Sequence, residues 1–383
     1  MTIPREAAFP VEEYRRRVTR VHARMADRKL DAIILFGPHN IAYLTGMDSE
    51  NLFDPQACIL GAGSDPILVI LDFELGRFEN SSWLEKPGLY GQFDDPVTAF
   101  AVAISAAGLS RSKLGVDSRG IGAQQYQRLV AALPDATIED SFGVVERVRL
   151  VKSSAEIELM GKAASFTDAG VEAGFAAIAD GRCDYEVAAA IMGGLYGSGS
   201  DLTCWGPIVA AGYRSGLAHS AHNGKTLTVG ESVFLELTGQ LRRYTAPLMR
   251  TAVVGKANAE QRRLAEASAG AVEAILEAAK AGTPANAVAA AGLRHIAPVE
   301  KGVVFHHNFG YPVGLGYPPS WIETLGFFLR TNNPEPIEAG MVFHLPMSLR
   351  VAGRFGICLS HTMLVTVDGG VALTRTPARL REL

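Results

Sequence analysis

The chain has 383 residues, of which 48% are hydrophobic and 20% are charged, and its formal net charge at pH 7 is −4. This length suggests roughly two or three domains of about 150 residues each, with ample apolar material for their cores. The weak acidic charge argues against nucleic acid as a partner. Four scattered cysteines without a CxxC pair argue against a zinc knuckle or a disulfide framework.

Helices and strands are predicted to alternate over residues 1–150. Apolar residues at helical intervals predict a helix over 11–30, and the apolar run 31–36 predicts a buried strand. Further strands are expected at 59–60, 67–71 and 114–116, and further helices at 97–107 and 122–133. This alternation is typical of an α/β domain that ends near residue 150.

A different pattern is predicted over residues 151–383. Ser153 and Glu156 match a capping box, which predicts the start of a long helix through about residue 179. Further helices are expected at 184–195, 259–281 and 286–296, and strands at 207–211, 232–237, 249–254, 341–347 and 357–367. Glycine and proline within GYPVGLGYPP at 310–319 predict a tight turn there. Long helices with mostly antiparallel strands indicate an α+β domain.

The opening residues lack the apolar core of a signal peptide, and the apolar runs at 32–36 and 66–71 are too short to cross a bilayer. The unpaired cysteines suit a reducing compartment. We therefore expect a cytoplasmic protein that acts on a small molecule, with neither a membrane nor a nucleic acid as its partner.

Glu236 is the most informative polar residue, because it lies inside the apolar run 233–237. A carboxylate in an apolar strand must be paired, protonated or functional, since burying a lone charge is costly. Desolvation also raises its basicity, which suits a nucleophile or a general base. The alternative is a glutamate of an edge strand that faces water.

Histidines gather in two short segments. His219 and His222 are three residues apart in a loop flanked by glycine, a spacing that suits acid–base work or a metal, although a lone loop histidine is more often a surface residue. His306 and His307 are adjacent and would point in different directions in a strand, so we expect at most one of them in a site.

Several segments, taken in order, resemble the creatinase/prolidase/aminopeptidase P family. They are residues 149–160, the interval of seventeen residues from His219 to Glu236, RYTAPLMRT at 243–251, PIEAGMVFHL at 336–345 and HTMLVTVDG at 361–369. The resemblance covers the whole chain. It implies an α/β N-terminal domain over residues 1–150 and an α+β pita-bread catalytic domain over residues 151–383.

The resemblance also bears on metals. In the metal-dependent members, two aspartates, a histidine and two glutamates hold two metal ions, and these five positions fall here on Glu236, Pro247, Tyr311, Pro346 and Ser360. One carboxylate out of five does not hold such a pair, so the resemblance implies a hydrolase without a metal cofactor. Because His307, His344 and His361 lie nearby, a different site with one metal ion and histidine ligands is left open.

Within the family the chain is most similar to its metal-free hydrolases. Creatinase uses the histidine at the position of His219 as an acid–base, but its substrate-binding carboxylates fall here on Met249 and Pro346. Ectoine hydrolases share GESVFLELTG at 230–239 and GYPVGLGYPPSW at 310–321, and the glutamate that matches Glu236 is their nucleophile. Thr245 and Cys358 stand where we expect histidine and glutamate in those enzymes. The resemblance therefore implies the same catalytic strategy, with a carboxylate at the position of Glu236, but the substrate need not be ectoine.

This likeness implies hydrolysis of a non-peptide C–N bond in a small polar amidine, cyclic amidine or guanidino compound. Glu236 would attack or activate water, His219 would carry a proton to the leaving nitrogen, and Glu323 would hold the substrate's cationic group. Arg330 would pair with a substrate carboxylate. The remaining residues expected around the substrate are Tyr311, Tyr317, Trp321 and His222.

The family also implies a homodimer in which the N-terminal domain of one subunit reaches the partner's site. Phe53 and Asp54 are the candidates for that contact, and an ordinary surface loop is the alternative. Two other functions remain open: a metal-dependent Xaa-Pro dipeptidase or aminopeptidase, and a non-catalytic binding protein on the same fold.

Overall fold

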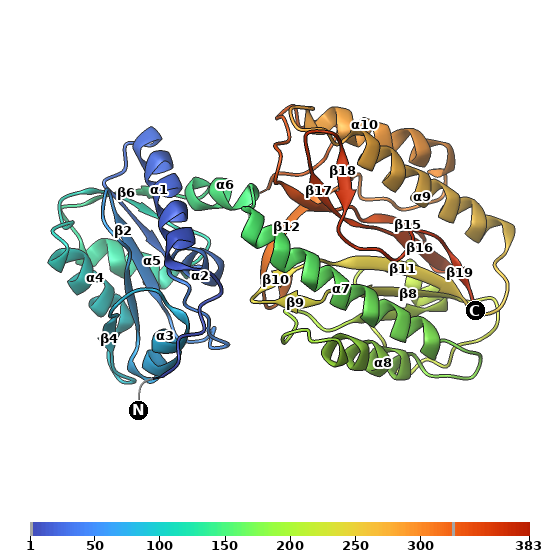
Figure 1. The fold of residues 1–383 in the computed structure, drawn as a ribbon, viewed down its shortest axis with the longest axis horizontal. Helices are drawn as coiled ribbons and strands as arrows, with labels where there is room; N and C mark the ends of the chain where they lie inside the picture. Colours follow the sequence, from blue (N-terminus) through green and yellow to red (C-terminus); the bar gives the residue numbers. More distant parts are fainter. Residues whose placement is uncertain (1–2, 324–325) are drawn as a thin grey trace. The chain divides into compact units, whose positions relative to one another are not determined.

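The computed structural model describes residues 3–323 and 326–383, and the chain divides into two compact units, Met1–Arg149 and Leu150–Leu383 (Figure 1). In the part of the chain that is described, no helix combines the length and the apolar character needed to cross a membrane. Each unit has its own sheets and core, and each is described by itself.

The first unit is built on one mixed sheet with the strand order β4-β3-β2-β1-β5-β6. Its strands are β1 (Ala32–Leu35), β2 (Ala57–Gly61), β3 (Ile67–Leu71), β4 (Gly88–Tyr90), β5 (Lys113–Val116) and β6 (Thr137–Asp140). Its helices are α1 (Val11–Asp27), α2 (Pro38–Thr45), α3 (Leu75–Ser81), α4 (Pro96–Ala106), α5 (Ala123–Ala132) and α6 (Val144–Leu150). The predicted α/β architecture is therefore present.

One face of this sheet forms the core with α4 and α5. Ile34 of β1 and Val69 of β3 belong to the same buried cluster as Phe100 of α4 and Leu129 of α5. The edge strand β6 was not predicted, because its sequence TIED is only half-buried and carries no apolar run.

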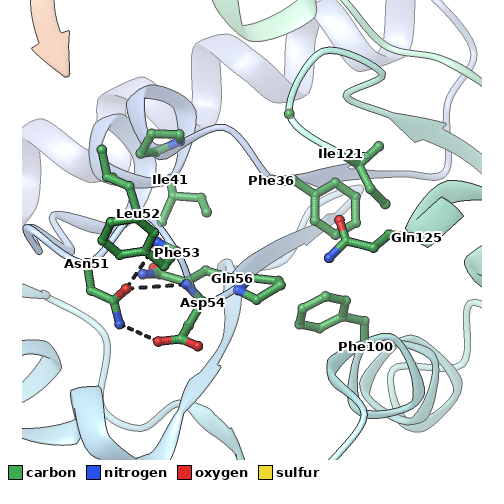
Figure 2. Close-up of a pocket in the computed structure, with 13 residues that line it drawn as sticks. Phe36, Ile41, Asn51, Leu52, Phe53, Asp54, Gln56, Phe100, Ile121 and Gln125 are labelled. Carbon is green, nitrogen blue, oxygen red and sulfur yellow. Dashed lines mark hydrogen bonds between the residues drawn. The ribbon is translucent and has the colours of Figure 1, made fainter. Parts of the chain in front are cut away.

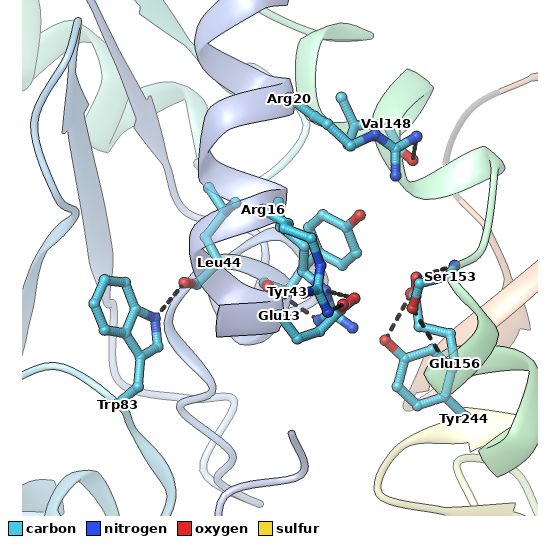
Figure 3. Close-up of polar contacts among 11 residues, drawn as sticks. Glu13, Arg16, Arg20, Tyr43, Leu44, Trp83, Val148, Ser153, Glu156 and Tyr244 are labelled. Carbon is cyan, nitrogen blue, oxygen red and sulfur yellow. Dashed lines mark hydrogen bonds and ion pairs between the residues drawn. The ribbon is translucent and has the colours of Figure 1, made fainter. Parts of the chain in front are cut away.

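Within its described residues, 150–323 and 326–383, the second unit contains four long helices and three sheets. The helices are α7 (Ser154–Ala177), α8 (Asp184–Gly197), α9 (Ala259–Ala278) and α10 (Ala285–Ile296). One sheet has the order β19-β11-β8-β7, a second has the order β18-β17-β14-β12-β10-β9 with β13 on β12, and β15 pairs with β16. The capping box at Ser153 and Glu156 is confirmed, and Glu156 also accepts a hydrogen bond from the hydroxyl of Tyr244 (Figure 3).

The strands of the second unit pass repeatedly from one sheet to another. They are β7 (Ile208–Ala211), β8 (Ser232–Leu237), β9 (Gln240–Leu241), β10 (Tyr244–Thr245), β11 (Leu248–Val253), β12 (Tyr311–Tyr317), β13 (Ser320–Ile322), β14 (Val342–His344), β15 (Met347–Val351), β16 (Phe355–Leu359), β17 (Thr362–Val365), β18 (Gly370–Ala372) and β19 (Arg381–Glu382). The single strand predicted at 341–347 is β14 and β15, separated near Pro346. The one predicted at 357–367 is β16 and β17, separated at Ser360.

The predicted tight turn within 310–319 is wrong for residues 311–317, which form the buried strand β12. Its glycines are needed for close packing, not for turning. A Cβ on Gly314 would lie 2.3 Å from Oε1 of Glu323, and one on Gly316 would lie 2.6 Å from Cγ2 of Thr245. Real side chains do not approach so closely, so neighbouring elements can pack here only because these positions lack side chains.

Candidate active site

The alternation of β8 determines which way Glu236 points. Val233 and Leu235 belong to the core cluster that β8 forms with α7 and α8, whereas Phe234 belongs to a smaller cluster on the opposite face of the sheet. Because side chains alternate along a strand, Glu236 shares the face of Phe234. Its cross-strand neighbours there are Ile208 of β7 and Met249 of β11.

This surrounding makes Glu236 an unusually basic carboxylate. Its side chain is 7% exposed, and burial raises its pKa to about 7, with the positive charge of Arg350 acting in the opposite direction. Among the described residues, no hydrogen bond or ion pair reaches its carboxylate. Near neutral pH it is therefore divided between an acid and a base form, which suits proton transfer or nucleophilic attack.

Arg350 is the cation that acts on this carboxylate, and it was not among the site residues predicted from the sequence. Its Nη1 donates to the carbonyl oxygens of Ser215 at 2.7 Å and Leu217 at 3.0 Å, and its guanidinium lies 5.0 Å from the ring centroid of Phe234. It stands in the buried strand β15. The signal that selected Glu236, a charge inside an apolar strand, is also present in this position.

A buried chain of hydrogen bonds lies beside Glu236 and joins Trp321, Tyr311, His344 and Ser360. Nε1 of Trp321 donates to Oη of Tyr311 at 3.0 Å, and Nδ1 of His344 lies 2.6 Å from the same oxygen. Nε2 of His344 lies 2.7 Å from Oγ of Ser360, which also accepts from the backbone N–H of Met249 at 2.6 Å. We call these four side chains the Tyr311 chain.

Burial keeps the ionisable members of the Tyr311 chain neutral. It raises the pKa of Tyr311 well above its usual value, and the nearby negative charge of Glu236 acts in the same direction. Burial also lowers the pKa of His344 to about 3, assisted by the charge of Arg250. At neutral pH the chain therefore contains a phenol and a neutral imidazole.

The two predicted loop histidines lie at the surface. His219 is exposed and has a φ of 56°, and His222 is exposed three residues further along the same loop. Although His306 is also exposed, desolvation of its imidazole and the charges of Arg350 and Arg330 lower its pKa to about 4, with a smaller effect from His219. These electrostatic couplings bring His306, His219, Arg330 and Arg350 into one neighbourhood.

His307 points elsewhere, since its Nε2 lies 2.8 Å from the carboxylate of Glu300. Arg330 is exposed, and its guanidinium lies over the ring of Phe328 at 4.3 Å. Because it is exposed, its guanidinium can meet an anion from solvent.

Glu323 is buried and has a partner within the protein. Its Oε1 lies 3.7 Å from Nζ of Lys152, and both side chains are 3% exposed or less. Because a buried ion pair is stable only when both partners stay together, this pairing competes with the predicted contact to a substrate cation.

The predicted aromatic residues line the same region in different ways. Trp321 belongs to the Tyr311 chain, and its ring centroid lies 5.8 Å from that of Trp205. Tyr317 is 2% exposed, and the guanidinium of Arg243 lies 4.7 Å from its ring centroid. Tyr317, which was expected beside the substrate, thus has its ring next to a cation of the protein.

Phe53 and Asp54 belong to the first unit, in the loop before β2. Phe53 is 94% exposed, and Asp54 accepts a hydrogen bond of 2.8 Å from Nδ2 of Asn51. Figure 2 shows this loop on one side of a cavity of about 210 Å³, with Phe100 and Gln125 on the other side. All the residues that line this cavity belong to the first unit.

The donor set does not fit a pair of metal ions. Of the five positions that correspond to ligands in metal-dependent relatives, two are prolines, and Tyr311 and Ser360 are both bonded to His344. His361 is bonded to Thr374 at 2.7 Å. Throughout residues 3–323 and 326–383, no group of three or more His, Cys, Asp or Glu side chains is arranged to hold a metal ion.

Comparisons with known proteins agree with this architecture. A model of the creatinase/prolidase N-terminal domain matches residues 17–151, and a model of metallopeptidase family M24 matches residues 158–367. The chain superposes on an Xaa-Pro dipeptidase from Bacillus anthracis with a TM-score of 0.84 at 21% identity, covering 97% of this chain and 100% of that one. The predicted fold class, an α/β domain followed by a pita-bread domain, is confirmed.

Relatives with assigned activities fall into two groups. Ectoine hydrolase of Halomonas elongata is 28% identical, with 97% of this chain and 98% of that protein covered. Xaa-Pro dipeptidase of Pyrococcus horikoshii is 25% identical, with 93% of this chain and 96% of that protein covered. The two levels of identity are too similar to choose between the activities, so the choice depends on the residues of the site.

Proposed function

The chain belongs to metallopeptidase family M24, and from this premise we propose that it is a hydrolase that cleaves a non-peptide C–N bond without a bound metal. The substrate class that fits is a small polar amidine, cyclic amidine or guanidino compound. The observation that carries the proposal is Glu236. It is a buried carboxylate whose pKa is raised to about 7, and the other four positions that match metal ligands of the family hold two prolines, Tyr311 and Ser360.

The charge of Glu236 complements such a substrate. The central carbon of an amidinium already carries positive charge, so a carboxylate held close to it lowers the barrier to addition. Glu236 can either attack that carbon directly or take a proton from water that attacks it. Both routes need the ionised form, which is populated near neutral pH.

The other predicted residues take the following places in this proposal. Arg330 at the entrance, with Arg350 deeper in the site, favours a substrate that also carries a carboxylate. In this proposal His219, whose charge acts on His306, stands at the approach to the site, with His222 three residues further along the same exposed loop. Glu323 shapes the site through its ion pair with Lys152, and Trp321 forms part of its wall. Phe53 and Asp54 remain our candidates for completing a partner's site in a homodimer.

Ectoine hydrolase among the relatives supports this proposal, and the Xaa-Pro dipeptidases support the alternative of a metal-dependent peptidase. Metal analysis of protein purified without chelator, followed by turnover assays, separates the two. The substrate panel contains ectoine, hydroxyectoine, creatine, related amidino and guanidino acids, and Xaa-Pro dipeptides.

We expect less than one transition-metal ion per chain and turnover of an amidine or guanidino compound that survives chelator treatment. Glu236→Gln provides the matched inactive variant. Two bound transition-metal ions per chain with cleavage of Xaa-Pro dipeptides would replace our proposal by the peptidase alternative. Tight binding of a panel member without turnover would indicate a binding protein.

A further inference from the structure

The positions of the protons in the Tyr311 chain are restricted, because each end of the chain is bonded by a group that can only donate a hydrogen bond. The indole N–H of Trp321 can only donate to Oη of Tyr311, and the backbone N–H of Met249 can only donate to Oγ of Ser360. Between these ends stands His344, which is neutral and carries one ring proton. Only two proton arrangements are therefore possible.

In the first arrangement, Tyr311 donates to Nδ1 of His344 and Nε2–H of His344 donates to Ser360. Oγ of Ser360 then accepts two hydrogen bonds, and its own hydroxyl hydrogen has no acceptor among the described residues. Ser360 has no exposed surface, so water does not supply one. Leaving a buried donor without a partner costs about 1–3 kcal/mol.

In the second arrangement, Ser360 donates to Nε2 of His344, and Nδ1–H of His344 donates to Tyr311. Every donor of the chain except the Tyr311 hydroxyl then has an acceptor, and Oη of Tyr311 accepts two N–H groups. The one hydrogen not used within the chain is that of the Tyr311 hydroxyl. Tyr311 retains 7% exposure whereas Ser360 has none, so a hydroxyl hydrogen without a protein acceptor is better tolerated at Tyr311, which also interacts electrostatically with Glu236.

We propose that Tyr311 is the catalytic proton donor to the leaving nitrogen, and that Trp321, His344 and Ser360 hold it in that role. This inference rests on the function proposed above and names the acid of that reaction. Two N–H groups directed at Oη stabilise the phenolate that forms when the proton leaves, in the manner of an oxyanion hole. His344 and Ser360 are positioning residues, because they act through Tyr311.

The proton balance closes within the site. In the general-base version, Glu236 takes a proton from water, and the hydroxide forms a bond to the amidine carbon. Tyr311 gives its proton to the leaving nitrogen as the C–N bond breaks with its electron pair. The protonated Glu236 then returns a proton to the phenolate, a downhill transfer because the carboxyl is the stronger acid. The net reaction adds one water and releases an amide and an amine.

The test measures kcat for two substrates that differ only in their leaving group. One releases an alkylamine and the other releases a nitroaniline. An alkylamine cannot depart without a proton, whereas a nitroaniline departs far more easily. For Tyr311→Phe we expect kcat to fall about 100-fold or more with the alkylamine and less than about 10-fold with the nitroaniline, at a similar KM. Trp321→Phe, which removes one N–H from Oη, should show the same selectivity at about a tenth of the size.

Tyr244→Phe is the matched control. It removes a buried phenol hydroxyl from β10, where its partner is Glu156 at the start of α7 (Figure 3), and should leave the leaving-group dependence unchanged. The inference would be overturned if Tyr311→Phe lowered kcat equally for both leaving groups, or if its kcat with the alkylamine stayed within about threefold of the parent value. Should Tyr311→Phe fail to fold, Trp321→Phe decides by the same comparison.

The proposed function and the role of Tyr311 as proton donor can be refuted independently of each other. If the substrate panel shows only cleavage of Xaa-Pro dipeptides, the proposed function is lost, and the leaving-group series is then repeated with aminoacyl alkylamides and nitroanilides. A selective loss in Tyr311→Phe on that series would still support Tyr311 as the proton donor. A uniform loss would refute it independently of the substrate class.

Discussion

Replacing Glu236 with glutamine should stabilise the protein at alkaline pH while it abolishes turnover. The ordinary pKa of a glutamate is 4.5, and burial raises that of Glu236 to about 7. A raised pKa means that the folded state binds this proton more tightly than the unfolded state does. The carboxylate is therefore destabilising above the folded pKa, and this cost disappears below the unfolded pKa.

The magnitude follows from these two values. At 1.36 kcal/mol for each pH unit, the difference between 4.5 and about 7 corresponds to a cost of about 3 kcal/mol above pH 7. Glutamine has nearly the same shape and no charge, so Glu236→Gln should remove this cost. We expect the variant to gain about 2–3 kcal/mol over the parent near pH 8 and almost nothing near pH 4.

Urea unfolding across this pH range measures the difference, and Glu273→Gln on the exposed face of α9 is the control that should show no such trend. A difference in unfolding free energy between Glu236→Gln and the parent that stays constant from about pH 5 to about pH 8.5 would refute the reasoning. It would mean that Glu236 titrates in the folded protein as it does in the unfolded chain.

Three further predictions test other parts of the site. Gly314→Ala places a Cβ 2.3 Å from Oε1 of Glu323 and should destabilise the fold by about 2–4 kcal/mol in thermal or urea unfolding, by separating the buried pair with Lys152. Arg330→Ala should raise KM about 10-fold for a substrate with a carboxylate and leave it unchanged for the corresponding amide, as initial rates will show. Arg350→Met removes the cation that lowers the pKa of Glu236, so the acid limb of the activity profile should move to higher pH, and an unmoved limb would count against this contact.

Local sequence patterns determined much of the second unit. The helices α7, α8, α9 and α10 were predicted because their apolar residues recur at helical spacing, and Ser153 and Glu156 marked the start of α7 through a local capping interaction. Glu236 was selected because a charge inside an apolar strand is visible in the sequence. Each of these signals involves residues that are neighbours along the chain.

Only the tertiary structure decided what surrounds Glu236. The Tyr311 chain joins β12, β13, β14 and the residue after β16, and the backbone of Met249 in β11, 111 positions before Ser360, bonds to it. The contact between Arg350 and Phe234 and the pairing of Lys152 with Glu323 are likewise long-range. Such long-range contacts depend on the register of the sheets and on which strands are neighbours. The local periodicity of the sequence therefore does not predict them.

The same limit explains the tight turn wrongly predicted for 311–317. Glycine and proline favour turns when only their neighbours along the chain are considered, but here Gly314 and Gly316 are required by Glu323 and Thr245, which approach from other elements. The sequence alone determined the two-domain architecture and the buried carboxylate. The packing of distant strands decided that this carboxylate stands beside a neutral hydrogen-bond chain, because only folding brings those residues within bonding distance.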